Sequence, residues 1–318
     1  MSDSALWSGL FVQHGDMRKK VSGSLAHNGG ALDFERMSHF AWCQCFAIWL
    51  DDTTCASEAA ALDFYRTSRD RFKDSIATCA GATLQVRDVR DIDAAVADGK
   101  TAALLTVENA RMIGDLSVVE EMAEDGVKMA SLSWNGANQL ASGNETHDSL
   151  SHLGRCAVRA FEDARIVVDV SHLNEQSFWD LASVARRPFV ASHSNARGVC
   201  NVPRNLTDDQ FRAIRDSGGL VGLNYYRAFL SSRNAFEDGC EVTFDEVAAH
   251  VEHWLELDGG DTVSLGSDYD GGDVPAWLDG CEKLAGFRAR MGERFGRDLA
   301  DKLFYANARD FFVRNETM

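Results

Sequence analysis

The strongest constraint on the fold is a repeated alternation of short apolar runs with amphipathic segments. Eight apolar runs are separated by stretches of helical character, among them SVVEEMAEDG and LTDDQFRAIRDSGG. Near-continuous runs of Val, Ile, Leu, Ala and Phe are typical of strands that are buried on both faces. The strands predicted in this way occupy residues 8–14, 41–48, 101–108, 127–134, 165–172, 187–193, 218–226 and 261–268.

Eight strand–helix repeats in a chain of 318 residues are the pattern of an α/β protein with a closed (β/α)8 barrel of the TIM type. A doubly wound sheet is the alternative, but it would normally need a glycine-rich turn after its first strand, and none is present. Only three prolines occur, and no Gly/Ser-rich linker interrupts the pattern. We therefore predict a single barrel domain over residues 1–318.

Charge and composition limit the partners. The formal net charge of −17 argues against nucleic acid and against anionic membrane surfaces. The sequence shows neither a signal peptide nor an apolar run of about 18 residues. Its eight cysteines lack the spacing of a disulfide framework. We expect a cytoplasmic protein with reduced thiols and a small-molecule substrate, and a homodimer stays open.

Side chains suited to metal binding or acid–base chemistry stand at the ends of five predicted strands. The first strand ends in an HxD pair, whose two side chains project to the same side of an extended chain. Because the C-terminal ends of barrel strands converge on one face, we expect all these side chains to share one pocket. They are His14, Asp16, Glu108, His172, His193 and Asp268.

The composition of this set indicates the kind of metal. Three imidazoles and several carboxylates suit Zn²⁺ or a comparable transition metal better than Mg²⁺ or Ca²⁺. Five ligands with a carboxylate able to bridge favour two ions about 3.5–4 Å apart. Any one histidine could instead be a satisfied core residue. We interpret a second pair, His250 and His253 on one helical face, as packing or surface histidines because no third ligand is evident.

Several motifs resemble one known family. The chain is similar to the membrane (renal) dipeptidases, which are zinc dipeptidases of the amidohydrolase-like barrel superfamily (peptidase family M19). The resemblance runs from about residue 8 to the C-terminal helix and is most specific in QHGD, LLTVENA, VVDVSH, SHSNARGVCNVPRNLTDDQ, LVGLNYY and LGSDYDGG. It implies a metal-dependent, amidohydrolase-like barrel that hydrolyses dipeptides by means of a metal-activated water.

The resemblance also implies how two zinc ions would be held. His14 and Asp16 would bind one ion, and His172 and His193 would bind the other. Glu108 would bridge the two. A water acidified by both ions would then attack the scissile carbonyl.

Further residues match positions with family roles in the reaction. Asp268 would accept the proton of the attacking water and deliver it to the leaving amine. Arg204 would grip the substrate carboxylate with two parallel hydrogen bonds. Tyr226 would line the pocket. Asp270 lies two residues past Asp268, and from this position alone we expect it to orient the loop.

Two departures from the family pattern concern the substrate pocket. Trp134 stands where a histidine polarises the substrate carbonyl in well-known members, and His147 or His152 could supply the missing donor. Asn109 and Ala110 replace two glycines that often follow the bridging glutamate. We expect the Trp134 indole to form a wall of the substrate pocket and to favour small residues near the scissile bond.

Three functions are compatible with this set of residues. The first is a binuclear zinc dipeptidase. The second is a hydrolase of a related bond in the same site, such as that of an N-acyl amino acid, a lactam or a lactone. The third is a barrel that holds metal without catalysis, and Asp268 argues against it because a proton-shuttling acid serves no structural zinc.

Overall fold

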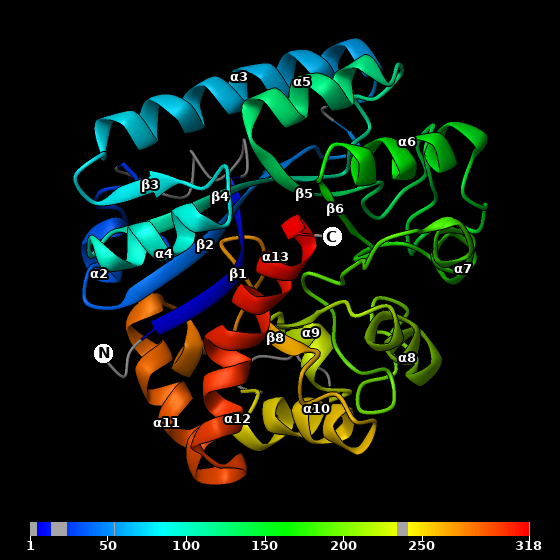
Figure 1. The fold of residues 1–318 in the computed structure, drawn as a ribbon. Helices are drawn as coiled ribbons and strands as arrows, with labels where there is room; N and C mark the ends of the chain where they lie inside the picture. Colours follow the sequence, from blue (N-terminus) through cyan, green and yellow to red (C-terminus); the bar gives the residue numbers. More distant parts are fainter. Residues whose placement is uncertain (1–4, 14–23, 54, 234–240, 318) are drawn as a thin grey trace.

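The structure is a computed structural model that describes residues 5–13, 24–53, 55–233 and 241–317. Parallel strands form its centre, and helices surround them (Figure 1). The strands are β1 (Ala5–Gln13), β2 (Ala41–Trp49), β3 (Thr83–Gln85), β4 (Thr101–Glu108), β5 (Val127–Ser131), β6 (Val167–Asp169), β7 (Val221–Asn224) and β8 (Val263–Tyr269).

The strand pairings close into a barrel, which confirms the predicted fold class. They run in the order β6-β5-β4-β2-β1-β8-β7. Between β6 and β7, Val190 forms a parallel bridge with Asp169, and Ala191 forms one with Val221. Residues 190–194 are called the seam here, because they complete the ring between the two ends of the sheet.

Two details differ from the predicted strands. The run 187–193 forms only the isolated bridges of the seam, and Pro188 at its start has no N–H to donate to a ladder. The three-residue β3 was not predicted. It pairs with the first half of β4, and β5 pairs with the second half, so β3 is an addition to the ring rather than a replacement within it.

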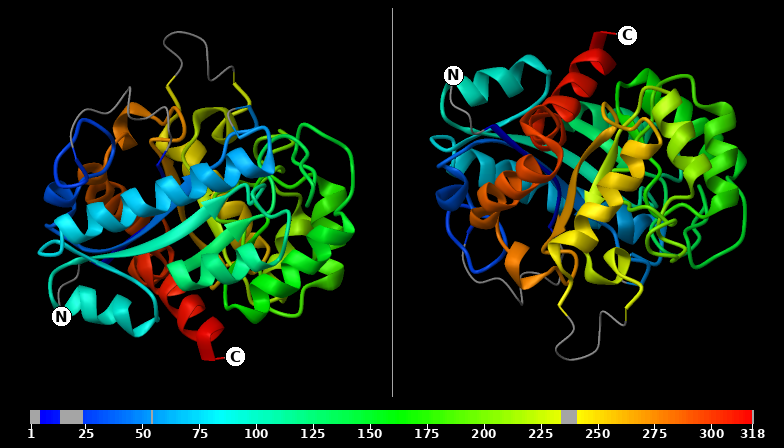
Figure 2. Two further views of the ribbon diagram at one scale, coloured as in Figure 1. Left: turned by 90° about the horizontal axis from the view of Figure 1, so that it is seen from above. Right: turned by 90° about the horizontal axis from the view of Figure 1, so that it is seen from below.

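The helices cover the outside of the ring (Figures 1 and 2). Side chains cap the starts of two of them: the Asn174 side chain accepts from the backbone N–H of Ser177, and Thr207 forms a capping box with Gln210. The helices are α2 (Phe34–Met37), α3 (Glu58–Thr78), α4 (Arg90–Ala97), α5 (Ser117–Asp125), α6 (His152–Asp163), α7 (Glu175–Val184), α8 (Asp208–Asp216), α9 (Arg227–Leu230), α10 (Phe244–Glu256), α11 (Leu284–Phe295), α12 (Arg297–Asp301) and α13 (Asn307–Thr317).

The alternation of side chains along β4 decides where its last residue points. Ala102 and Leu104 belong to a cluster that includes Phe312 of α13, and the intervening Ala103 and Leu105 pack in the main core. Because side chains alternate with a period of two, the Glu108 side chain projects from the same face of β4 as those of Ala102 and Leu104. Since α13 packs against the beginnings of the strands, the carboxyl ends lie at the opposite rim.

Among the described residues, no helix combines the length and apolar character that crossing a bilayer requires. The described cysteines are free thiols, and most of them are buried.

His250 of α10 is a core histidine. This agrees with the interpretation of His250 and His253 as packing or surface histidines. It is fully buried. Its Nδ1 accepts from the backbone N–H of Ala196 at 3.1 Å, and its Nε2 donates to the Leu230 carbonyl at 3.0 Å. Burial lowers the pKa of His250 to about 4. His253 lies 2.8 Å from an Asp208 carboxylate oxygen at the surface.

We expect the stability of the protein to fall between about pH 6.5 and pH 4 in part through His250. The unfolded chain binds a proton at this histidine near pH 6.5, whereas the folded chain binds it only near pH 4. The stabilisation is therefore complete above pH 6.5 and decreases by about 3 kcal/mol as the pH falls. Urea unfolding across this range measures it. His250→Gln keeps a donor and an acceptor but has no proton to gain, so its profile should be flatter; equal slopes would contradict the assignment.

Candidate metal centre

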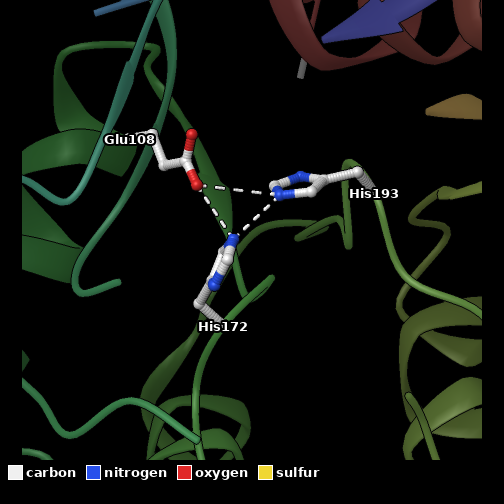
Figure 3. Close-up of side chains that lie close together, drawn as sticks. All are labelled: Glu108, His172 and His193. Atoms are coloured by element: carbon white, nitrogen blue, oxygen red, sulfur yellow. Dashed lines mark hydrogen bonds and ion pairs between the residues drawn. The ribbon is translucent and has the colours of Figure 1, made fainter. Parts of the chain in front are cut away.

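Three of the predicted ligands meet at the carboxyl rim of the barrel. Glu108 ends β4, His172 follows β6, and His193 belongs to the seam (Figure 3). The Nε2 atom of His172 lies 2.8 Å from Glu108 Oε1, and that of His193 lies 3.7 Å from the same oxygen. The two Nε2 atoms are 2.9 Å apart. All three side chains are buried, and together they form a group that could hold a metal ion.

The electrostatics of this group favour a bound cation. Burial, followed by the neighbouring Asp268, raises the pKa of Glu108 well above its ordinary value. Burial, followed by the positive charge of Arg204, lowers the pKa of His172 and His193 well below theirs. The imidazoles are therefore held neutral, which is the form that ligates metals. A cation would relieve the crowding of the buried carboxylates.

The second ring nitrogen of each histidine has a hydrogen-bond partner. His172 Nδ1 lies 2.9 Å from Asn135 Oδ1, and His193 Nδ1 lies 2.7 Å from Ser192 Oγ. Ser192 Oγ lies in turn 2.5 Å from Asp169 Oδ2. Metal-ligating histidines are oriented by contacts of this kind, and both Nε2 atoms remain directed at Glu108. Sequence reasoning missed these three partners, although all lie within or beside the predicted strand ends.

Asp268 stands on β8 close to the ligand group. Its Oδ2 accepts a hydrogen bond from Asn224 Nδ2 at 3.0 Å. Burial raises the pKa of Asp268, and the Asn224 contact opposes this shift. Asp270 instead accepts from the backbone N–H of Ala31 at 2.9 Å. The structure therefore places Asp268 beside the ligand group, whereas Asp270 anchors its own loop to the backbone of Ala31.

The predicted carboxylate-binding arginine lies against the two histidines. Arg204 is buried and donates through Nε to His172 Nδ1 at 3.2 Å, through one terminal nitrogen to Ser194 Oγ at 2.7 Å, and through the other to the His193 carbonyl at 3.0 Å. These contacts leave one N–H on each terminal nitrogen. His172 Nδ1 can accept from Arg204 only when it carries no hydrogen, and it can donate to Asn135 only when it carries one. A metal at Nε2 would require the hydrogen on Nδ1. Metal binding would therefore select the contact with Asn135.

Aromatic side chains stand beside the ligand group. Trp134 follows β5, and its ring lies 6.1 Å from that of His172. Trp49, at the end of β2, meets Trp134 edge-on at 4.9 Å. Tyr226 follows β7 and packs edge-on against Phe229 at 4.7 Å. The structure thus places Trp134 next to the candidate ligands, with Trp49 packed against it.

The two histidines considered as replacements for the family donor lie elsewhere. His147 is exposed and lines a surface cavity of about 480 Å³ together with Asn174 and Arg197. His152 is exposed at the start of α6, with its Nδ1 4.0 Å from the sulfur of Cys156. Neither belongs to the group formed by Glu108, so neither supplies the missing donor in this structure.

Left-handed backbone conformations cluster where the strands end at the site. The φ angles of Asn109, His172 and Asp268 are 69°, 73° and 68°. Such conformations cost non-glycine residues about 1–3 kcal/mol and are concentrated at functional sites. Asparagine tolerates this region better than most residues. Asn109 can therefore stand where relatives often have glycine, and its side chain donates to the Leu50 carbonyl at 2.6 Å.

His14 and Asp16 lie outside the described residues. Their strand is nevertheless placed by its backbone pairing. Gln13, the last residue of β1, pairs with Ile48, and the next residue of β2, Trp49, pairs with Glu108. The strand that precedes His14 therefore ends at the same rim as Glu108.

Known proteins are similar to this chain in sequence and in architecture. An uncharacterized protein from the pqqA 5' region of Klebsiella pneumoniae is 35% identical over 247 residues, which cover 74% of this chain and 90% of the relative. A solved dipeptidase AC, a metallopeptidase of family M19, has a TM-score of 0.89 and 25% identity, and the match covers 99% of each chain.

A metallopeptidase from Rhodobacter sphaeroides, solved with a phosphinate mimic of the dipeptide L-Ala-D-Ala, shares the fold with a TM-score of 0.86 and 24% identity, over 98% of this chain and 99% of its own. The family model of the membrane dipeptidases matches residues 16–308. Since that match spans nearly the whole sequence, the chain belongs to the membrane dipeptidase family, peptidase family M19.

Proposed function

We propose that this protein is a zinc-dependent dipeptidase with two zinc ions bridged by Glu108 at the carboxyl rim of the barrel. Its family consists of metallo-dipeptidases. The observation that carries the proposal for this chain is the convergence of Glu108, His172 and His193 from three separate strand ends into one buried group.

The donor set fits zinc. Two imidazole nitrogens and a carboxylate oxygen are typical zinc ligands, and the partners at Nδ1 leave the Nε2 atoms for the ion. We propose that His172 and His193 hold one ion. His14 and Asp16 would hold the other, which the position of the β1 end at the same rim supports.

The residues around the group can perform a peptide hydrolysis. When bound, the two ions supply Lewis acidity and lower the pKa of water toward neutrality. Asp268 is free to take up a proton on Oδ1 because Asn224 holds its Oδ2. It returns that proton to the nitrogen of the leaving amine. The remaining N–H groups of Arg204 bind the carboxylate of the C-terminal residue.

Aromatic rings would bound the substrate pocket that this function requires. We propose that Trp134 forms one wall and Tyr226 another, so that the side chains next to the scissile bond must be small. Edge-on packing by Trp49 keeps the Trp134 ring in place. The ligand of the Rhodobacter sphaeroides structure, a mimic of L-Ala-D-Ala, has the size expected for this pocket and is a suitable first compound to test.

The central test is metal content. We expect zinc-reconstituted protein to retain about two ions per chain, because five ligands exceed what one tetrahedral zinc with an open position uses. Glu108→Gln removes the anionic bridge and should retain one ion or fewer. Elemental analysis after removal of excess zinc measures both. A plateau at one ion or fewer in the wild-type protein would show that the site is not binuclear.

We expect Trp134 to determine substrate size. Trp134→His should raise kcat/KM on dipeptides with bulky residues relative to Ala-Ala by about tenfold, the range for a changed apolar contact. Trp134→Phe keeps the wall and removes the indole N–H, so a large loss in this variant would mean that the N–H contacts the developing oxyanion. Trp179→Phe is the control, because Trp179 of α7 is exposed. Unchanged preferences in both Trp134 variants would place Trp134 outside the pocket.

A further inference from the structure

We propose that Asp169 and Ser192 are positioning residues that fix which ring nitrogen of His193 carries its hydrogen. They form a chain of two hydrogen bonds, here called the relay, that runs from the Asp169 carboxylate through the Ser192 hydroxyl to His193 Nδ1. The proposal rests on the proposed function in that His193 is taken as a metal ligand.

The carboxylate at the base of the relay is buried and held by donors. Asp169 ends β6 and is 3% exposed. Its Oδ1 accepts the backbone N–H groups of Ser171 and Ser192, each at 2.9 Å. Its Oδ2 lies 2.5 Å from Ser192 Oγ, a distance typical of a hydroxyl that donates to a charged carboxylate. Asp169 is thus an acceptor toward three donors.

The direction of the relay follows from the number of hydrogens. A serine hydroxyl has one hydrogen, and Ser192 uses it toward Asp169. Toward His193 Nδ1, at 2.7 Å, the Ser192 oxygen can then only accept. His193 must therefore carry its hydrogen on Nδ1, which leaves the Nε2 lone pair directed at Glu108. A metal-ligating imidazole needs this tautomer.

The opposite direction is unfavourable. If Ser192 donated to His193, its oxygen would face Asp169 Oδ2 at 2.5 Å with no hydrogen between two acceptors. In a buried site this repulsion is poorly screened. The structure therefore supports one tautomer of His193 even before a metal is considered.

Asp169→Asn should reverse the relay without changing its shape. The amide oxygen must stay at the position of Oδ1, because two backbone N–H groups point there. The amide NH2 then takes the place of Oδ2 and donates to Ser192 Oγ. The Ser192 hydrogen, released from residue 169, can then turn to His193 Nδ1, and the hydrogen of the imidazole moves to Nε2, where it blocks the metal.

The experiment measures tautomer and zinc affinity separately. In metal-free protein, NMR of ¹⁵N-labelled histidine should show His193 with its hydrogen on Nδ1 in the wild type and on Nε2 in Asp169→Asn. Competition with a chromophoric chelator should show weaker zinc binding at the His172–His193 site, by about 10–100-fold, in Asp169→Asn and Ser192→Ala. Ser192→Thr retains the hydroxyl and should restore the affinity. A cavity of about 30 Å³ borders Ser192, so its added methyl group has space.

Ser194→Ala is the matched control in the same Ser-His-Ser motif. Its hydroxyl accepts from Arg204 and has no contact with the His193 ring, so zinc affinity should be unchanged. The proposal is overturned if wild-type His193 carries its hydrogen on Nε2, or if Ser192→Ala binds zinc as the wild type does. Failure of the wild-type protein to bind zinc would refute the proposed function instead, and the NMR result would still decide the relay.

Discussion

Asp268→Asn is expected to lower kcat by about 10²–10⁴, the range for a lost general acid or base, while the zinc content stays at the wild-type level. The amide can replace the carboxylate as acceptor for Asn224 Nδ2, so the local structure should persist. It cannot take a proton from the nucleophilic water or return one to the leaving amine. Steady-state kinetics on Ala-Ala and elemental analysis of the same sample measure the two properties together.

Asp270→Asn is a closely matched control for this experiment. Both residues have left-handed backbone conformations, with φ of 68° at Asp268 and 62° at Asp270, and asparagine tolerates this region. The amide oxygen introduced by the substitution can still accept from the backbone N–H of Ala31. The kcat of this variant should therefore remain within about tenfold of wild type, inside the range of a conservative change away from the reacting atoms. Similar kcat values for both variants would show that Asp268 is not the proton shuttle.

Arg204→Ala is expected to lower kcat/KM for dipeptides with a free carboxyl terminus by about 30–1000-fold. This corresponds to about 2–4 kcal/mol for a lost charge-assisted, bidentate contact. Arg204 retains one N–H on each terminal nitrogen, and a planar guanidinium with two such donors can bind a carboxylate. C-terminally amidated dipeptides should be poor substrates of the wild-type protein and should be little affected by the change.

Arg204→Lys separates charge from geometry, because lysine keeps the positive charge but lacks the planar fork. Most of the loss on free acids should persist in this variant. Arg204 also donates to the His193 carbonyl, so zinc content must be measured in both variants. Equal losses on acids and amides would assign Arg204 to maintaining the site. Faster turnover of lactones or lactams without a carboxylate, unaffected by Arg204→Ala, would favour the alternative hydrolase.

The residues at the strand ends could be predicted because a closed parallel barrel brings all strand ends together, whatever the packing of individual side chains. Glu108, His172 and His193 are far apart in the chain, yet each lies where an apolar run stops. Any closed parallel barrel brings such positions to one rim. The alternation along β4 then turns Glu108 to the same side as Leu104, and this too is visible in the sequence.

The residues that orient those ligands could not be predicted in the same way. Asp169 sits inside an apolar run and resembles an interruption of a buried strand, and Ser192 resembles a small filler beside a histidine. Their contact depends on the alignment of β6 with the seam, which depends on tertiary packing. The three-residue β3 was missed because so short a segment has no periodicity to detect.

The seam also bears on how the folded barrel would depend on bound zinc. Residues 190–194 join β6 through two backbone hydrogen bonds at Val190 and join β7 through bonds at Ala191 and Ser194. Zinc held by His172 and His193 would link the residues that follow β6 to the seam and so crosslink the two segments. Opening the ring there would then require the ion to be released, so the free energy of zinc binding would add to the barrier against local unfolding. Opening of the barrel at the seam would therefore be coupled to loss of the metal.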